Sequence, residues 1–269
     1  PICDHIVRHG WRPADMSNLF SESKFLFAFD VHEGKLLWRY DAQESIRHNA
    51  IALGNERVYL IDRALAEGDL LKWAERRGEA PPKFEHPPGK LIALNARTGQ
   101  VEWTSEQDIF GTVLQYSEPN DVLLMSYQST RFKLPSEQGG RLAAFRGSNG
   151  YRIWDREAKY ITRTLINDRT IYAQGGAWDL LTGEEQPFDF TRSYGCGQLA
   201  GSKNLLLYRS ATLGYYDLAG EKRTRNFGGV RPGCWINTIP VGGIVLVPDA
   251  SAGCVCSYQT RAWLALQGE

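Results

Sequence analysis

The sequence contains no long apolar run, no excess of charge and few signs of redox or thiol chemistry. A membrane-spanning helix needs about 20 consecutive apolar residues, and no apolar stretch here approaches that length. The 31 Lys and Arg residues balance 31 Asp and Glu residues, so the formal net charge is zero. Because a neutral chain exerts no general attraction on nucleic acid or anionic lipid, we expect neither as a partner.

Motifs for covalent haem and for a catalytic thiol are also missing. The chain has 5 Cys and 5 His residues but no Cys-x-x-Cys-His segment, which excludes c-type haem attachment. All the histidines precede residue 90, so the sequence places no base near the cysteines that follow residue 190. The chain begins without Met and without an apolar signal region, from which we expect a processed product or a fragment.

Glycine and aromatic residues are abundant instead. The chain contains 27 Gly, 8 Trp, 12 Tyr and 11 Phe residues, while 42% of all residues are hydrophobic and 23% are charged. This balance is typical of a globular chain with a sizeable core. Aromatic residues favour strands and glycine favours turns, so the composition predicts many strands and many turns.

One short pattern recurs along the chain: an apolar strand ending in Asp or a substitute, Gly four residues later and Trp four after that. Three copies keep this spacing, and they contain Asp30, Gly34 and Trp38; Asn95, Gly99 and Trp103; and Arg146, Gly150 and Trp154. Two looser copies contain Asp179 with Gly183 and Asp217 with Gly220. A short polar side chain followed by Gly is turn chemistry, so each copy predicts a hairpin, and we expect the three tryptophans to occupy equivalent positions.

Two further strand-like runs lie between successive hairpins, for example residues 49–53 and 58–62. Four strands per unit, repeated along the chain, are typical of a propeller blade. The predicted fold is therefore an all-β β-propeller of four-stranded antiparallel blades, with five to six blades in this chain. Complete units begin near residues 49, 111, 162, 196 and 234, and the hairpin at 25–40 is half a blade. Either residues 1–20 complete a six-bladed ring or, as we favour, the chain is the C-terminal part of a larger ring.

We therefore divide the chain into residues 1–24, an N-terminal segment of uncertain role, and residues 25–269, the propeller blades. The blades carry an insertion at 64–88, whose pattern predicts a short helix over 64–77. This insertion is either surface decoration or a partner or lid element that uses Leu70, Leu71 and Trp73. A second insertion, at 129–140, shows no helical pattern.

The Ala-x-Asp-x-x-Thr-Gly-x-x-x-Trp pattern resembles the tryptophan-docking repeat of the PQQ-binding-like β-propeller superfamily over about residues 25–266. The C-terminal third is most similar to bacterial PQQ-like propeller proteins of unassigned function. The segments that carry this second resemblance include Tyr194-Gly195-Cys196, Tyr208-Arg209-Ser210, Gly214-Tyr215-Tyr216-Asp217, Asn226-Phe227-Gly228-Gly229 and Cys254-Val255-Cys256. The resemblance implies a periplasmic or otherwise extracytoplasmic location, since such proteins are commonly exported.

The superfamily includes quinoprotein dehydrogenases, which hold PQQ against two adjacent, disulfide-bonded cysteines and bind calcium beside it. This chain has no adjacent Cys pair, and we match none of its residues to the calcium ligands, so no catalytic residue is carried over. Asp62 and Asp249 are candidate cation ligands, but a structural role at a turn or surface is the favoured interpretation. PQQ with calcium is expected only under the alternative that the chain is an enzyme.

Cys196, Cys234, Cys254 and Cys256 all fall where a first strand begins or where a second strand turns into a third. In a four-stranded antiparallel blade these two places lie at the same end, so we expect all four thiols on one face. We predict at least one disulfide among them, as is common in exported proteins. A four-thiolate metal site and unpaired thiols are the alternatives.

The same geometry nominates a ring of polar and aromatic residues as a ligand site, because pockets favour such mouths. The candidates are His48, Arg63, Gln174, Arg209, Trp235, Asn237 and Asp249. The alternative is structural, because polar residues normally lie at strand ends, and Arg209 would then pair with Asp249.

We therefore expect a non-catalytic binding or scaffold protein that presents a protein-partner or small-ligand site on the Cys-bearing face. The alternative is a PQQ-dependent, quinoprotein-like oxidoreductase or a fragment of one. Fold does not decide between these functions, since one propeller scaffold supports many activities. The sequence predicts neither the ligand nor the oligomeric state.

Overall fold

The computed structural model describes residues 22–64, 87–127, 140–233, 236–249 and 262–267. These residues form β-strands, turns and loops without any helix, as the predicted all-β fold requires. The described part of the chain thus offers no helix that could cross a membrane. The helix predicted at 64–77, the insertion at 129–140 and most of the N-terminal segment lie outside the described residues.

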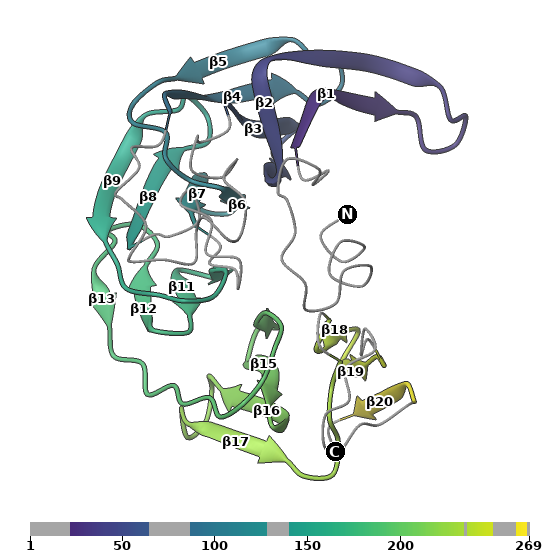
Figure 1. Cartoon of the computed structure of the whole chain (residues 1–269), viewed down its shortest axis with the longest axis vertical. Helices are drawn as coiled ribbons and strands as arrows, with labels where there is room; N and C mark the ends of the chain where they lie inside the picture. Colours follow the sequence, from purple (N-terminus) through teal and green to yellow (C-terminus); the bar gives the residue numbers. More distant parts are fainter. Residues whose placement is uncertain (1–21, 65–86, 128–139, 234–235, 250–261, 268–269) are drawn as a thin grey trace, which may run out of the picture. The chain divides into compact units, whose positions relative to one another are not determined.

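The strands form five antiparallel sheets in two compact units (Figure 1). The first unit comprises Pro1–Lys159 and Leu180–Gly183, and the second comprises Tyr160–Asp179 and Glu184–Glu269. Sheets of four antiparallel strands in sequence order are the predicted blades, and three of the five sheets have this form.

The first unit holds two sheets. One has the order β1 (Glu22–Phe29), β2 (Leu36–Gly54), β3 (Arg57–Arg63), β4 (Gly89–Asn95) and β5 (Val101–Ser105). The other has the order β6 (Val113–Ser117), β7 (Val122–Ser126), β8 (Arg141–Arg146) and β9 (Arg152–Glu157).

The second unit holds three sheets. The first runs β10 (Leu165–Asn167), β11 (Thr170–Ala173), β12 (Gly176–Asp179) and β13 (Glu185–Gln186). The next runs β14 (Ala200–Gly201), β15 (Leu205–Ser210), β16 (Thr212–Asp217) and β17 (Thr224–Phe227). The last has three described strands, β18 (Ile239–Val241), β19 (Ile244–Val247) and β20 (Leu264–Gln267).

The first sheet has five strands because β2 serves two neighbours. Its first half pairs with β1, and its second half pairs with β3, so the predicted hairpin and the predicted first blade share one strand. The buried carboxylate of Asp62 holds the junction: it accepts hydrogen bonds from the backbone N–H groups of Gln43, Glu44 and Ser45 at 2.7, 2.9 and 3.1 Å. Asp62 therefore has a structural role, but it is buried in β3 rather than at the turn or surface position that the sequence predicted.

The three tryptophans of the repeat occupy equivalent positions, as predicted. Each indole N–H donates to the carbonyl oxygen of the residue that follows the Asp position of the next repeat, at 2.9 Å in every case. The three pairs are Trp38 with Ala96, Trp103 with Gly147 and Trp154 with Leu180. The turn glycines that lie against these rings, Gly99, Gly150 and Gly183, have φ values of 71°, 73° and 73°.

A β-bulge precedes each of these tryptophans. The pairing shifts by one residue between Ala28 and Phe29, between Ala93 and Leu94, and between Ala144 and Phe145. Because a bulge re-aims the side chain beside it, the shared irregularity explains why all three indoles point toward the next repeat. The Asp179 copy has neither a bulge nor a Trp at this place, and Phe188 packs there against Tyr216 of β16.

Candidate functional site

The start of a first strand and the end of a second strand lie side by side, as the sequence argument requires. The N–H of Thr112 donates to the carbonyl oxygen of Ser126 at 2.9 Å, and the N–H of Ile161 donates to the carbonyl oxygen of Gln174 at 3.0 Å. In the third such pair the donor lies on the other side: the N–H of Ala211, which follows β15, donates to the carbonyl oxygen of Tyr194, which precedes β14. In the second unit this arrangement collects several of the predicted site residues at one end of the sheets.

Arg192 gathers these residues around its guanidinium group. Its Nε donates to the carbonyl oxygen of Arg209 at 2.8 Å, and its Nη2 donates to that of Cys196 at 2.8 Å. Nη1 and Nη2 both reach the carbonyl oxygen of Gly197 at 3.2 Å, and Nη1 reaches the side-chain oxygen of Gln174 at 3.4 Å. We call Arg192 with these four partners the arginine clamp.

Two glycines allow the chain to approach the clamp closely. A side chain at Gly195 would place its Cβ 2.4 Å from the carbonyl oxygen of Arg209. A side chain at Gly197, where φ is 89°, would place its Cβ 2.4 Å from the amide nitrogen of Asn237. Only glycine fits either place without displacing backbone or a buried amide.

Asn237 ties the clamp to the last sheet. Its side chain is 3% exposed, its oxygen accepts the N–H of Arg209 at 3.0 Å, and its Nδ2 donates to the carbonyl oxygen of Gly233 at 2.7 Å. A buried amide with both ends bonded fixes its neighbours firmly. Asn237 therefore links the end of β15 to the segment that precedes β18.

The clamp concentrates positive charge. Burial lowers the pKa of Arg192, and the nearby Arg209 guanidinium lowers it further. The Arg209 side chain is 1% exposed, and its guanidinium carbon lies 5.2 Å from the ring centre of Tyr194. Carbonyl oxygens stabilise the Arg192 guanidinium group, and an aromatic face stabilises that of Arg209.

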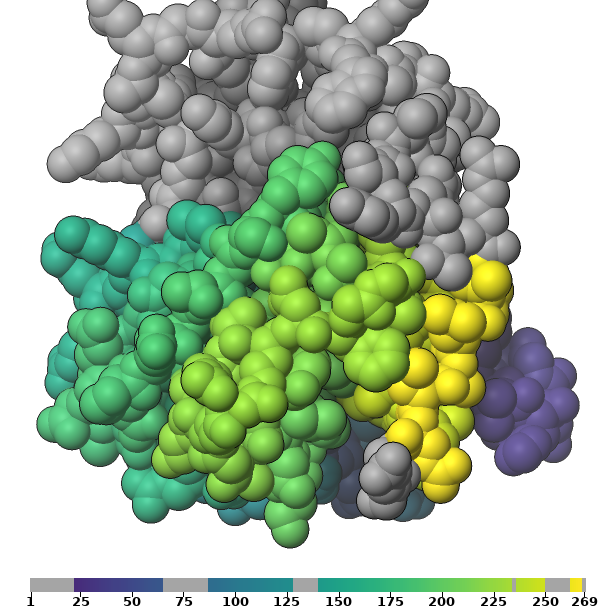
Figure 2. Space-filling view, turned by 90° about the horizontal axis from the view of Figure 1, so that it is seen from below, coloured from purple at the N-terminus to yellow at the C-terminus, as the bar shows by residue number. Residues whose placement is uncertain are grey.

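A shallow groove of about 530 Å³ lies beside the clamp. It is lined by Thr191, Arg192, Ser193, Ser210, Thr224, Arg225 and Asn226. Figure 2 shows the yellow-green segment around β17, which supplies the last three of these residues, at the surface.

The hydroxyl groups of the groove hold one another in place. The Ser193 and Ser210 hydroxyls are 3.0 Å apart, and the N–H of Ser193 also donates to the Ser210 hydroxyl at 3.0 Å. The Thr224 hydroxyl donates to the carbonyl oxygen of Thr191 and accepts from the Tyr208 hydroxyl, both at 2.8 Å. Burial raises the pKa of Tyr208 to about 12, so Tyr208 remains a hydrogen-bond donor across the physiological range.

Two predicted site residues, Arg63 and His48, lie in the first unit. Arg63 is 6% exposed and donates to the carbonyl oxygen of Phe110 at 2.6 Å. The His48 ring nitrogen Nε2 is 2.7 Å from the Ser23 hydroxyl. Both therefore make structural contacts, and their role toward a ligand stays a prediction.

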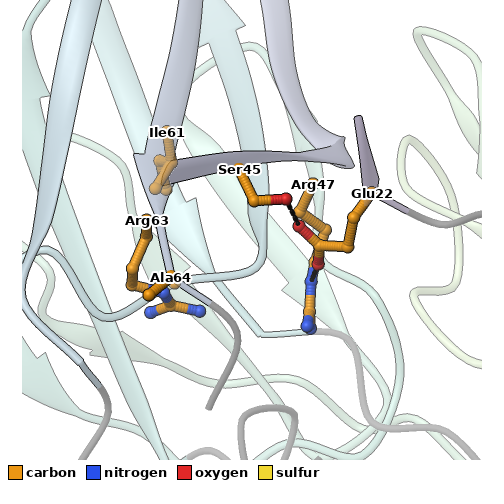
Figure 3. A pocket seen from close by; sticks show the side chains of 7 residues that line it. Glu22, Ser45, Arg47, Ile61, Arg63 and Ala64 are labelled. Atoms are coloured by element: carbon orange, nitrogen blue, oxygen red, sulfur yellow. Dashed lines mark hydrogen bonds and ion pairs between the residues drawn. The ribbon is translucent and has the colours of Figure 1, made fainter. Parts of the chain in front are cut away.

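Arg63 also lines a small pocket of about 10 Å³. Figure 3 shows Ser45 and Arg47 directed at Glu22 in this pocket, with Arg63 apart from that group. The Ser45 hydroxyl donates to Glu22 at 2.9 Å, and Arg47 forms an ion pair with Glu22 at 2.5 Å. A cavity of this volume accommodates about one water molecule, so it is too small for an organic ligand.

The structure describes only some of the remaining predicted site residues. Asp249 follows β19 and is half-buried, while Trp235, Cys234, Cys254 and Cys256 lie outside the described residues. Cys196 is exposed and is the one cysteine among the described residues, so no disulfide is seen in that part of the chain. The disulfide, the metal site and the Arg209–Asp249 pair therefore all stay predictions.

The described residues do not supply a donor set for the calcium that accompanies PQQ. In residues 22–64, 87–127, 140–233, 236–249 and 262–267, no three His, Cys, Asp or Glu side chains are grouped so that they could hold a metal ion. The one strongly bonded candidate, Asp62, already accepts three backbone N–H groups.

Sequence reasoning missed Arg192 and three hydroxyl-bearing residues of the groove, Thr191, Ser193 and Thr224. Arg192 lies between β13 and β14, in a segment with no strand pattern, and its partners are mostly backbone carbonyls that no side-chain motif marks. The available signal was the Gly195-Cys196-Gly197 spacing, because glycines on either side of one residue indicate close backbone approach.

Comparison with known proteins identifies the family to which the repeat belongs. A family model described as the outer membrane protein assembly factor BamB matches residues 5–184. None of the curated proteins matches the sequence significantly. The match covers Gln174 but ends before Arg192, Arg209 and Asn237, so most of the clamp lies beyond it.

Solved structures share the fold at low identity. The crystal structure of BamB from Moraxella catarrhalis is 18% identical with a TM-score of 0.50, covering 91% of this chain and 71% of that one. The Pan2 WD40 domain of Neurospora crassa is 11% identical with a TM-score of 0.50, covering 85% of this chain and 70% of that one. A europium-containing methanol dehydrogenase is 12% identical, covering 83% of this chain and 57% of that one, but its TM-score of 0.43 supports no inference.

Proposed function

The chain belongs to the BamB family of PQQ-like β-propellers, and from that premise we propose that it is a non-catalytic binding protein that works outside the cytoplasm. The description of the family model, an outer membrane protein assembly factor, supports a protein partner and a place in the cell envelope. We propose the groove and the arginine clamp of the second unit as the partner site.

The observation that carries this proposal is the groove itself, open and lined by hydroxyl, amide and guanidinium groups. Its lining is already fixed by internal hydrogen bonds, such as the one from Asn226 Nδ2 to the carbonyl oxygen of Ser210 at 3.0 Å. A preorganised polar surface binds with less loss of side-chain entropy than a mobile one. Donors of this kind suit an extended polypeptide segment that offers carbonyl oxygens and an acidic side chain.

A photo-crosslinking residue placed at Asn226 tests the site. We expect an adduct with one defined protein from an envelope extract of the source bacterium. The matched control places the same residue at Arg223, which is exposed nearby but does not line the groove. Arg225→Glu reverses a charge in the groove and is expected to lower the adduct yield several-fold. Equal adducts from positions 226 and 223, or none from either, contradict the groove as the partner site.

The alternative that the chain is a PQQ-dependent enzyme is tested by adding the cofactor. PQQ and calcium are added to the purified protein, and both the quinone absorbance and dye-linked dehydrogenase activity are followed. A non-catalytic protein shows no activity above a sample without protein. Turnover that depends on both additions would contradict the proposal.

A further inference from the structure

Arg163 belongs to the second unit and lies just before β10, the first strand of its sheet. Its backbone N–H donates to Gln198 Oε1 at 3.0 Å, and Gln198 lies just before β14, the first strand of the next sheet. The neighbouring Thr162 hydroxyl accepts the N–H of Gln174 at 2.9 Å. Two sheets of one unit therefore fix the backbone position of Arg163.

The guanidinium group of Arg163 has no partner among the described residues. The residue is partly buried, yet its side-chain nitrogens donate no hydrogen bond to a described residue and form no ion pair with one. Arg192 behaves differently, because its guanidinium group donates to the carbonyl oxygens of Arg209, Cys196 and Gly197.

The positive charge of Arg163 is also uncompensated within the described chain. Burial lowers the pKa of Arg163, and no described carboxylate raises it, whereas Asp155 and Asp108 raise the pKa of Arg141. Covered charges are normally paired, because removing an unpaired charge from water costs free energy. An uncompensated guanidinium group on a fixed backbone therefore indicates that a ligand supplies the negative charge.

Gln198 adds a second donor group beside Arg163. Because Gln198 Oε1 accepts the Arg163 N–H, the remaining end of the amide is Nε2, which donates no hydrogen bond to the described residues. The available groups of both side chains are therefore N–H donors. Such a pair repels a metal cation and suits an anion that offers oxygen acceptors.

We propose that Arg163 and Gln198, which we call the carboxylate site, bind the carboxylate group of a small organic acid. The guanidinium group donates two parallel hydrogen bonds to the carboxylate oxygens, and the Gln198 amide donates a third. One positive charge matches a monoanion, which favours a carboxylate over a phosphate dianion. Neither residue lines the groove, so the carboxylate site does not depend on the proposed function.

Titration of isotope-labelled, full-length protein with sodium acetate tests the carboxylate site. The readout is the Nε–Hε NMR signal of Arg163, identified by its absence from the spectrum of Arg163→Met. We expect acetate to shift this signal saturably, and sodium chloride at the same ionic strength to leave it in place, because chloride lacks paired oxygens. Inorganic phosphate is expected to bind more weakly than acetate, and tighter binding of phosphate would contradict a carboxylate ligand.

Thermal unfolding separates a ligand site from a structural arginine. Arg163→Met removes the charge and keeps a long, unbranched side chain. In chloride buffer we expect the variant to unfold at the wild-type temperature or above it, because an uncompensated charge is no longer covered. Acetate at about ten times its dissociation constant is expected to raise the melting temperature of the wild type by about 3–5 °C and to leave that of the variant unchanged.

Arg169→Met is the matched control, because Arg169 is an exposed arginine in the turn after β10 and pairs with Asp179. This variant is expected to keep the acetate shift and the acetate effect on the melting temperature. Two outcomes overturn the proposal. One is an Arg163 Nε–Hε signal that acetate leaves in place or that chloride shifts equally. The other is an Arg163→Met variant that unfolds several degrees below the wild type in chloride, which would show that the guanidinium group has a structural partner within the chain.

Discussion

At the scale of single residues, the turn glycines of the repeat meet two requirements at once. The turn glycines of the repeat hold a left-handed conformation and also leave room for an indole ring. The left-handed turn is local in sequence, whereas the ring that lies against it comes from the preceding repeat, as Trp38 does at Gly99. The constant spacing within each repeat is why the sequence predicted that the three tryptophans occupy equivalent positions.

Gly150→Ala separates these two requirements when it is compared with Gly34→Ala. At both positions the methyl group strains a left-handed residue, with φ values of 73° and 64°, which costs about 1–2 kcal/mol. At Gly150 the methyl group also meets the Trp103 ring at 2.6 Å. We expect Gly34→Ala to lower the free energy of unfolding by about 1–2 kcal/mol and Gly150→Ala by about 2–5 kcal/mol.

Urea denaturation of the two variants and the wild type measures this difference. Equal losses for Gly34→Ala and Gly150→Ala would show that the docked indole contributes little beyond the strained turn. A larger loss at Gly34 would contradict this expectation, because a Cβ at that position meets no described atom within 4 Å.

The predicted site residues show which part of the site the sequence pattern indicates and which part it does not. Gln174, Cys196, Arg209 and Asn237 come together because strand ends of one kind share one end of a sheet, which the sequence pattern implies. Arg192, which connects them, lies in an irregular segment whose path depends on tertiary contacts. No local pattern indicates which carbonyl oxygens a guanidinium group in such a segment will meet.

At the scale of elements, β2 shows how a buried carboxylate shapes a strand. The sequence predicted a separate hairpin and first blade, whereas one strand of 19 residues serves both. The Asp62 side chain is 2% exposed and binds the backbone of the junction from the neighbouring strand β3. This contact joins residues that are distant in sequence, so periodicity alone did not predict it.

Asp62→Asn tests this element. The amide keeps the size of the carboxylate but replaces one acceptor oxygen by a donor, so at least one N–H of residues 43–45 loses its partner. We expect the free energy of unfolding to fall by about 1–3 kcal/mol, and hydrogen exchange to become faster at residues 43–45.

Asp41→Asn is the matched control, because Asp41 is an exposed carboxylate of β2, the strand that contains the junction, and pairs with Arg39. Exposed ion pairs contribute about 0–1 kcal/mol, so this variant is expected to remain close to the wild type. Hydrogen exchange at residues 43–45 that is unchanged in Asp62→Asn would show that the carboxylate does not hold the junction.

At the scale of the whole molecule, the two units share one repeat but differ in what stabilises them. The first unit uses docked indoles at every repeat boundary that the structure describes within it. The second unit has Phe188 and Phe190 packed against Tyr208 and Tyr216, followed by the arginine clamp. A covalent link in the second unit would compensate for the missing tryptophans.

The disulfide predicted among Cys196, Cys234, Cys254 and Cys256 is such a link, and Cys196 is the one of the four that the structure describes. The Cys196 thiol is exposed and adjoins the clamp through its carbonyl oxygen, so it is accessible to another thiol at the same end of the sheets. A bond from Cys196 to Cys234, Cys254 or Cys256 would close a loop of about 40–60 residues, worth about 3–4 kcal/mol if unstrained.

We expect alkylation and mass spectrometry of the native protein to find at least one disulfide, and reduction to lower the melting temperature of the wild type. Cys196→Ser is expected to remove the bond and most of the effect of reduction, whereas Cys3→Ser leaves both unchanged. Five alkylated cysteines in native, unreduced protein would contradict the disulfide and favour free thiols. A protein mass that exceeds the sequence mass by one zinc ion, lost with a chelator, would favour the four-thiolate site.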